Sequence, residues 1–474
     1  MIHTLYIALV VAFGLFSAGH ALLNKRDPRA GFLWILLCLG FPLGGALFYW
    51  LFGVNRIRTR ARRWQRRGKG MHWLRTAASG AAQDKGLKQL PHYLRPLTVL
   101  CDAVTRRPLV GGNRIEPLFN GEQAYPQMLE AIATARHSVF LSSYIFDSSH
   151  TGRDFVSALA EAASRGVDVR VLVDALGECY SFPRVRGLLK NSGIRTAIFL
   201  PFSLSRRGFY LNLRNHRKLL VVDNSQGFTG GMNLDDCHLV NPPGRKKSVS
   251  DVHFRLQGPV VEHLREAFLE DWHFATGEKR KERTWPSPER AGVALCRGVS
   301  AGPNEELEKL QWIIIGALDS AREKVRIMTP YFIPERALIS AINAASLRGV
   351  ELEIILPERS NLPFVHWAGR AYHWELLQYG TRIYYQPPPF CHSKLLLVDG
   401  HFALIGSANI DPRSLRLNFE FCVEVYDPEF NRGMARYFDE RLSQSAEVTR
   451  EEVDARPFPA RFRDSLAKLF SPYL

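Results

Sequence analysis

NHRKLLVVDNSQGFTGGMN, residues 215–233, returns in altered form as CHSKLLLVDGHFALIGSAN, residues 391–409. The two copies align without a gap. Each holds a histidine, a lysine two residues on, an apolar run, an aspartate, a turn of small residues and an asparagine. These shared positions are His216, Lys218, Asp223 and Asn233 in the first motif, and His392, Lys394, Asp399 and Asn409 in the second motif. A single copy could arise by chance, but the repeat predicts one chemical unit used twice.

Each motif has the pattern of a buried hairpin. A short apolar run, residues 219–222 or 395–398, ends in Asp-Asn or Asp-Gly, which is a turn signal, and a second apolar run follows. In an extended strand, residues two apart face the same way, so the histidine and lysine of each motif are expected to project together.

The paired motifs resemble the HxKxxxxD signature of the phospholipase D superfamily, in which two copies build one active site. The resemblance is closest to bacterial cardiolipin synthases of the phospholipase D type, and it covers nearly the whole chain. Three further stretches carry it, namely 212–215, 329–334 and 411–420, together with the 471–474 end. Where the family often has acidic residues, this chain has Ser148, Ser149 and His150.

The resemblance implies a fold and a chemistry. The fold is α/β, with tandem phospholipase D-like sandwich halves related by pseudo-two-fold symmetry and preceded by two transmembrane helices. His216 would be the nucleophile and His392 the acid and base, although the residues alone leave that order open. The two lysines, with Asn233 and Asn409, would hold the phosphate oxygens. Such a site needs no metal and no nucleotide cofactor.

Four acidic residues accompany the histidines. Asp223 and Asp399 belong to the motif itself but follow their histidines by most of a strand, so we expect them to bond the turn or the neighbouring backbone. Asp251 and Glu420 lie in strand-like runs downstream of each motif, VSDVHFRL and NFEFCVEV. Because they stand in similar places in the two halves, these two are the predicted histidine-orienting groups, against the alternative of a solvated strand face.

The beginning of the chain is apolar. Residues 4–23 and 31–52 form two runs, each long enough to cross a bilayer. A signal peptide is the competing interpretation of the first run, but no basic region precedes it and a second run follows at once. Pro42, Gly44 and Gly45 interrupt the second run, so a re-entrant hairpin is the alternative to two spans.

Charge sets the expected orientation. Arginines and a lysine crowd the segment after the second run, from Arg56 to Lys69, and this excess places that end in the cytoplasm. The expected location is therefore the bacterial inner membrane, multi-pass, with the catalytic halves in the cytoplasm. A formal net charge of +16 favours an anionic partner, either nucleic acid or an acidic lipid surface. Beside a membrane run, lipid is the simpler interpretation, and Arg206 and Arg207 in a 198–213 loop fit it too.

The domain organisation follows the repeat. We expect a hairpin at 1–55, a basic connector at 56–110, a first half at 111–275, a linker at 276–303 and a second half at 304–474. In both halves helices alternate with strands, at 124–135, 138–145, 152–165 and 167–173, and at 307–321, 324–328, 335–348 and 350–356. The seven cysteines form no CxxC pair, which indicates neither a zinc site nor a disulfide framework.

The predicted function is cardiolipin synthesis by a phosphatidyltransferase. A phosphatidyl group would pass from one phosphatidylglycerol to another through a phosphohistidine, releasing glycerol. A phospholipase D that transfers the group to water, and less favourably a nuclease, are the alternatives. No nucleic-acid partner is expected, since the apolar runs serve no purpose in a cytosolic nuclease. The second substrate and the oligomeric state stay open.

Overall fold

The computed structural model describes residues 2–25, 28–54, 90–190, 192–201, 213–241, 247–278, 285–302 and 308–471. They belong to a small unit at the start of the chain and a large unit that holds both motifs. The arginine-rich segment after Arg56, together with Arg206 and Arg207, lies outside the described residues. The 472–474 end does as well.

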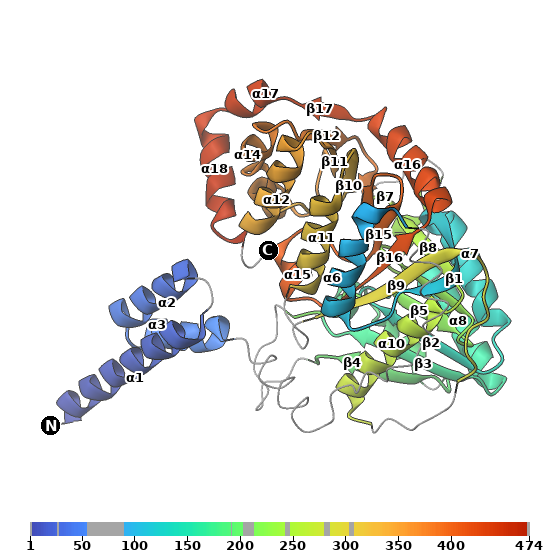
Figure 1. Cartoon of the computed structure of the whole chain (residues 1–474). Coiled ribbons are helices and arrows are strands. Elements are labelled where there is room, and N and C mark those ends of the chain that lie inside the picture. The colour runs from blue at the N-terminus through green and yellow to red at the C-terminus, as the bar shows by residue number, and fades with distance from the viewer. Residues whose placement is uncertain are drawn as a thin grey trace. The chain divides into compact units, whose positions relative to one another are not determined.

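The small unit is helical (Figure 1). It consists of α1 (Ile2–Asn24), α2 (Pro28–Gly40), α3 (Gly44–Phe48) and a π-helical turn (Tyr49–Gly53). Gly14 allows close packing, because a Cβ there would lie 2.9 Å from the Cys38 carbonyl oxygen. Polar contacts cross the unit, with Trp50 Nε1 donating to Ser17 Oγ at 2.9 Å.

The first expected span is confirmed as a helix and the second is not one helix. Within the described residues, only 3–24 form a helix long and apolar enough to cross a membrane, judged by length and composition. The 31–52 run is broken at residues 41–43, between α2 and α3. Proline lacks a backbone N–H, so Pro42 cannot continue the hydrogen-bond ladder of α2.

The first half of the large unit alternates strands and helices. Its elements are β1 (Val110–Phe119), α7 (Asn120–Ala133), β2 (Ser138–Ser143), α8 (His150–Ser164), β3 (Asp168–Asp174), α9 (Val185–Leu189), β4 (Arg195–Phe199), β5 (Leu219–Val222), β6 (Gln226–Gly230), β7 (Val249–Ser250), β8 (Val252–Gln257) and α10 (Val260–Thr276). The expected helices and strands are thus confirmed, with ends that differ by a few residues.

The second half repeats the pattern and adds C-terminal elements. It holds β9 (Ala294–Ala301), α11 (Lys309–Ser320), β10 (Lys324–Met328), α12 (Arg336–Leu347), β11 (Glu351–Pro357), α13 (Pro363–Arg370), α14 (His373–Leu377), β12 (Arg382–Gln386), β13 (Phe390–Cys391), β14 (Leu395–Val398), β15 (Phe402–Gly406), α15 (Pro412–Arg416), β16 (Glu420–Tyr426), α16 (Pro428–Leu442), β17 (Ala446–Val448), α17 (Arg450–Asp454) and α18 (Phe458–Lys468).

The strands of both halves join in one 15-stranded sheet. Its order is β17-β12-β11-β10-β14-β15-β16-β9-β1-β8-β6-β5-β2-β3-β4. Apart from β17, the order reads alike outward from the antiparallel β1–β9 pair, where the halves meet. The pseudo-two-fold relation predicted from the motifs therefore passes through the centre of a continuous sheet.

Helices cover both faces of this sheet (Figure 1). In the first half α7 and α8 contact the strands on one side and α10 contacts them from the other. In the second half α12 and α16 do the same. Two apolar cores result, one in each half.

Two expected boundaries are wrong. Residues 294–301 of the predicted linker form β9, whose alternating and mostly buried side chains pair with both β1 and β16. The predicted connector, 56–110, contains α6 (Arg95–Thr105), an amphipathic helix that buries Leu97 and Cys101 in the core of the second half. Apolar periodicity won over local charge in both segments.

Candidate active site

The motif hairpins form as expected. Leu219–Val222 pairs antiparallel with Gln226–Gly230, and Leu395–Val398 pairs with Phe402–Gly406. His216 and His392 lie just before the opening strand of their hairpins. These hairpins stand in equivalent central positions of the sheet, so each histidine leaves its half toward the pseudo-two-fold axis.

The motif aspartates hold the turns. Asp223 accepts hydrogen bonds from the backbone N–H groups of residues 136, 137 and 138 at 2.7 to 2.8 Å. Asp399 accepts from those of residues 322, 323 and 324 at 2.8 to 2.9 Å. Both aspartates have positive φ, 51° and 49°, which Asp and Asn tolerate better than most residues. The geometry matches the predicted structural role.

Asp223→Asn and Asp399→Asn are each expected to lower stability by about 2 to 3 kcal/mol, because a charged acceptor of three N–H groups is lost. The substitution keeps the shape and the positive φ. Thermal melting of the full chain measures the effect, with Asp319→Asn on the exposed surface as the control. Unchanged melting together with lost turnover would instead make these aspartates part of the chemistry.

The histidines and their acidic partners come from opposite halves. His216 Nδ1 lies 3.1 Å from Glu420 Oε1 and 3.2 Å from Oε2, and His392 Nδ1 lies 2.8 Å from Asp251 Oδ2. Both carboxylates are fully buried. A carboxylate only accepts, so each Nδ1 carries the proton and each Nε2 keeps its lone pair.

Backbone pairing between the halves enforces this crossing. β7 and β13 pair in parallel as a separate two-stranded sheet, and the N–H of His392 donates to the Ser250 carbonyl at 2.7 Å. On the other side the N–H of His216 donates to the Phe419 carbonyl at 2.9 Å. Each histidine is thereby placed beside the residue that precedes the other half's carboxylate.

The two acidic pairs differ in one detail. Ser407 Oγ donates to Glu420 Oε2 at 2.5 Å and accepts from the N–H of Phe421 at 3.0 Å. The matching position in the first motif is Gly231, where a Cβ would lie only 2.5 Å from Asp251 Oδ2. The shorter acid thus goes with glycine and the longer acid with serine.

The two lysines lie close to both histidines. Lys218 Nζ donates to the His216 carbonyl at 2.7 Å, and Lys394 makes the same bond to His392. Burial lowers the pKa of Lys218 to about 7, with Lys394 adding to the shift and Glu420 opposing it. Burial likewise lowers the pKa of Lys394 to about 8. Because each motif acts on the charge of the other, the two motifs share one site.

The pKa values of the histidines also fall. Burial lowers the pKa of His216, and Glu420 opposes that shift. Burial lowers the pKa of His392 well below its ordinary value, and Lys394, Lys218 and His216 add to the effect. Burial raises the pKa of Asp251, whereas His216 and Lys218 outweigh burial at Glu420 and hold its pKa low.

The motif asparagines are both buried near the histidines. Asn233 Oδ1 accepts from the N–H of Ile145 at 3.3 Å, and Asn409 Nδ2 donates to Ser414 Oγ at 3.3 Å. The Oδ1 atom of Asn409 is buried and makes no hydrogen bond within the described residues. Tyrosine rings also face the histidines, Tyr144 at 5.1 Å from His216 and Tyr331 at 6.4 Å from His392, measured between ring centroids.

Two nearby residues were missed in the sequence. Arg217, between the first histidine and lysine, is fully buried and donates to the Glu420 carbonyl at 3.1 Å, to Asp271 at 3.0 Å and to Ser300 at 2.6 Å. His238 accepts from the N–H of Asn233 at 3.2 Å, and its ring lies 6.3 Å from that of His392. Extending the ungapped repeat by five residues pairs His238 with Ser414, which would have drawn attention to both.

Acid side chains gather here without forming a metal site. Within the ranges that the structure describes, no group of three or more His, Cys, Asp or Glu side chains is placed to hold a metal ion. The arrangement instead offers two unprotonated Nε2 atoms and two lysine ammonium groups. It is suited to a nucleophilic exchange at a phosphodiester, in which charge on the nonbridging oxygens needs fixed donors.

The sequence has known relatives along its whole length. It is 32% identical to a cardiolipin synthase from Geobacillus sp. (strain WCH70), over 95% of this chain and 90% of that protein. It is 31% identical to the major cardiolipin synthase ClsA of Bacillus subtilis (strain 168), over 95% of each chain. It is also 31% identical to cardiolipin synthase A of Pseudomonas aeruginosa (strain LESB58), over all of this chain and 97% of that one.

A solved structure shares the fold. The phosphatidylserine synthase of Haemophilus influenzae Rd KW20 superposes with a TM-score of 0.63 at 15% identity, over 80% of this chain and all of that one. The family described as "Cardiolipin synthase, PLD-like domain" matches residues 128–272 and 314–442, one segment in each half. With both motifs complete and facing one site, the chain belongs to the cardiolipin synthase family of phospholipase D-like proteins.

Proposed function

We propose that this protein is a cardiolipin synthase that transfers the phosphatidyl group of one phosphatidylglycerol to the free hydroxyl of another, giving cardiolipin and glycerol. The observation that carries the proposal is the pair of complete motifs whose histidines are each held by a carboxylate from the opposite half. Two equivalent histidines suit a reaction that exchanges one glycerol alcohol for another, because the leaving group and the acceptor are chemically alike.

The first step makes a phosphohistidine. His216 Nε2, with its Nδ1–H held by Glu420, attacks phosphorus and forms the P–N bond. The P–O bond to the glycerol headgroup breaks, and the glycerol oxygen takes a proton from Nε2 of His392. Asp251 at 2.8 Å stabilises the imidazolium form of His392 that donates this proton.

The second step reverses these roles. The free hydroxyl of a second phosphatidylglycerol gives its proton to Nε2 of His392 and attacks phosphorus. The P–N bond breaks, which frees His216, and the new P–O bond completes cardiolipin. Lys218, Lys394 and the two asparagines hold the nonbridging oxygens while charge builds up on them. No energy source is required, since one phosphodiester replaces another.

The lysine charges set an expected pH dependence. The pKa values of Lys218 and Lys394 lie at about 7 and 8, so the protonated forms that bind phosphate are lost as pH rises through that range. We expect kcat/KM to fall by about tenfold or more between pH 7.5 and pH 9.5. Initial rates in detergent micelles measure it, with melting temperatures at each pH as the control for folding. A profile that stays flat to pH 9.5 would contradict the proposal.

We further propose that the protein resides in the bacterial inner membrane with the large unit on the cytoplasmic side. The apolar α1 helix and the basic residues that follow the apolar runs support this placement. A chain lacking residues 2–54 is expected to leave the membrane on alkaline carbonate extraction, whereas the full chain should stay. Retention of the shortened chain after extraction would place the anchor elsewhere.

The identity of the acceptor decides between synthase and hydrolase. Purified full-length protein is incubated with vesicles of labelled phosphatidylglycerol, and the products are resolved by mass spectrometry. Cardiolipin with an equal amount of glycerol is the expected result. Phosphatidic acid as the main product would overturn the synthase proposal in favour of a phospholipase D, and cleavage of DNA without lipid turnover would favour a nuclease.

A further inference from the structure

The helix α18 carries an apolar stripe on its outer side. Phe458, Phe462 and Leu466 follow one another at intervals of four residues and are exposed, with 72% and 60% of the two phenylalanines accessible. Leu469, 73% exposed, and Phe470 continue the stripe past the end of the helix. Rows of this kind lie on one face of a helix and are ordinarily buried.

The opposite side of α18 is fixed to the large unit. Ala467 is buried and packs with Ile333 and Ala368, and α18 lies against α13. Asp464 is the only acidic residue of α18 and is also buried, where it accepts hydrogen bonds from Arg456 and Arg463. The helix is therefore rigidly mounted with its apolar side turned outward and free of negative charge.

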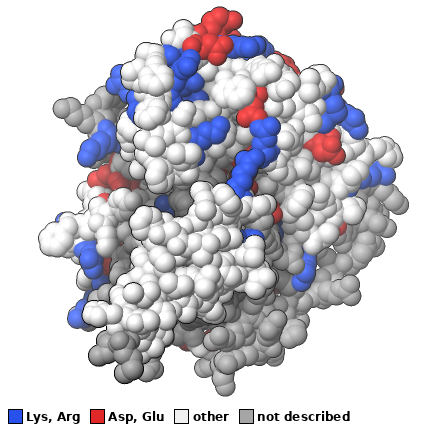
Figure 2. Space-filling view, turned by 90° about the vertical axis from the view of Figure 1, so that its left-hand side faces the viewer, with Lys and Arg blue, Asp and Glu red and all other residues white. Residues whose placement is uncertain are grey.

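Basic residues flank the stripe. At about 100° per residue, Arg461 and Lys468 fall along one edge of the stripe and Arg463 along the other. Figure 2 looks onto this side of the large unit, where lysine and arginine side chains lie in its upper part beside broad uncharged surface. An apolar stripe bordered by cations is typical of a helix that lies in the interface of an anionic membrane.

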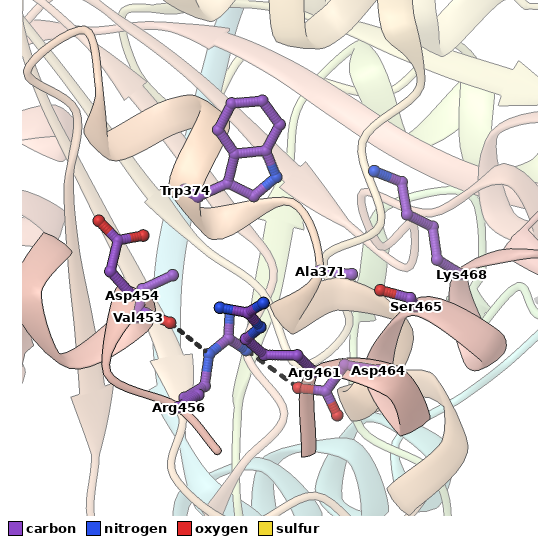
Figure 3. Close-up of a pocket in the computed structure, with 9 residues that line it drawn as sticks. All are labelled: Ala371, Trp374, Val453, Asp454, Arg456, Arg461, Asp464, Ser465 and Lys468. Atoms are coloured by element: carbon purple, nitrogen blue, oxygen red, sulfur yellow. Dashed lines mark hydrogen bonds and ion pairs between the residues drawn. The ribbon is translucent and has the colours of Figure 1, made fainter. Parts of the chain in front are cut away.

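A cavity adjoins the basic edge. It has a volume of about 270 Å³ and is lined by Arg456, Arg461, Ser465 and Lys468, with Trp374 on the far side (Figure 3). Lys468 Nζ also lies 4.1 Å from the centroid of the Tyr372 ring. Burial, and to a lesser degree Arg336, lowers the pKa of Lys468, as expected for a cation in a basic cluster. A phosphate of a lipid headgroup fits the size and charge of this cavity.

We propose that α18 docks the large unit on the surface of an anionic phospholipid bilayer, with the stripe at the level of the acyl chains and the basic cavity at the headgroups. The proposal rests on the proposed function, which requires a lipid substrate. α13, which packs on α18, also approaches the loop that bears Tyr331, since a Cβ at Gly369 would lie 2.6 Å from the Phe332 carbonyl oxygen. Docking thus holds the membrane surface one helix away from the Tyr331 side of the site.

Photocrosslinking tests the contact without depending on turnover. Full-length protein with benzoyl-phenylalanine in place of Phe462 is irradiated in vesicles of phosphatidylglycerol and phosphatidylcholine, and the peptide that contains residue 462 is weighed. A lipid adduct is expected, with at least a threefold lower yield in phosphatidylcholine alone or after Arg461→Gln and Lys468→Gln. An adduct to α1–α3 of the same chain, a species of twice the mass, or equal yields in both vesicles would overturn the proposal.

An activity comparison gives a second test. Phe458→Ser with Phe462→Ser is expected to lower cardiolipin formation in vesicles by about tenfold and to leave the rate in detergent micelles unchanged, because micelles deliver lipid from any side. Val99→Ser with Val293→Ser, which also removes two exposed apolar residues, serves as the control. Equal vesicle rates for both variants would refute the docking role, whereas wild-type protein that is inactive in both media would refute the proposed function instead.

Discussion

Replacement of either motif histidine by alanine is expected to lower cardiolipin formation by at least about four orders of magnitude. His216→Ala removes the atom that bonds to phosphorus, and His392→Ala removes the group that protonates the leaving glycerol. Neither task passes to a neighbour, because His238 already accepts from a backbone N–H and its pKa is lowered to about 3 by burial. Mass spectrometry of the products over long incubations measures the residual rate.

The double variant separates a shared site from two independent sites. Since the histidines act as one unit, His216→Ala with His392→Ala should be no slower than either single variant. His150→Ala, on an exposed histidine, is the control and should leave turnover unchanged. Two independent sites would leave about half of the activity in each single variant, and that result would contradict the crossed arrangement.

Glu420→Gln and Asp251→Asn are expected to lower turnover by about two to three orders of magnitude. Loss of the orienting acid in a serine protease triad costs about four orders. The smaller figure here reflects the lysines and asparagines, which still bind the phosphate. Melting temperatures should move by no more than about 3 °C, since both substitutions keep the side-chain shape.

The crossed pairing makes this prediction specific to each step. Glu420 holds His216, so Glu420→Gln should slow formation of the phosphohistidine in rapid-quench experiments with labelled phosphatidylglycerol. Asp251 holds His392, so Asp251→Asn should shift the acidic limb of the pH profile by weakening the imidazolium. Asp223→Asn and Asp399→Asn are the matched comparison. If they proved inactive but stable while Glu420→Gln and Asp251→Asn stayed near wild type, the two acidic pairs would have opposite roles.

Local patterns in the sequence predicted most of the fold. The hairpins, the alternating helices and the turn-binding aspartates depend on residues close in sequence, so Asp223 and Asp399 could be assigned before their three N–H partners were known. Asp251 and Glu420 were found because the halves repeat. Their crossing was not, since it depends on the β7–β13 pair and on the Asn215–Phe419 bridge, both of which join residues more than 100 apart.

Other features required the folded chain. Arg217 reads as one more cation in a basic protein, yet it is buried and bonds to elements from both halves. The charged residues of α6 concealed an amphipathic helix, and the 31–52 run passed a length test that ignores the break at Pro42. Composition reports how much charge or apolar surface is present, whereas only tertiary contacts decide which of it is buried.

The crossed pairs also bear on how such a chain could arise. A single half, standing alone, would present a histidine without its carboxylate, and it could complete a site only by pairing with an identical copy about a two-fold axis. In such a homodimer any change at one histidine's partner would be imposed on both. Fusion of the copies into one chain removes that constraint, and Gly231 beside Asp251 opposite Ser407 beside Glu420 records the resulting divergence. Ancestry by duplication thus gives a once symmetric pair of histidines the freedom to specialise.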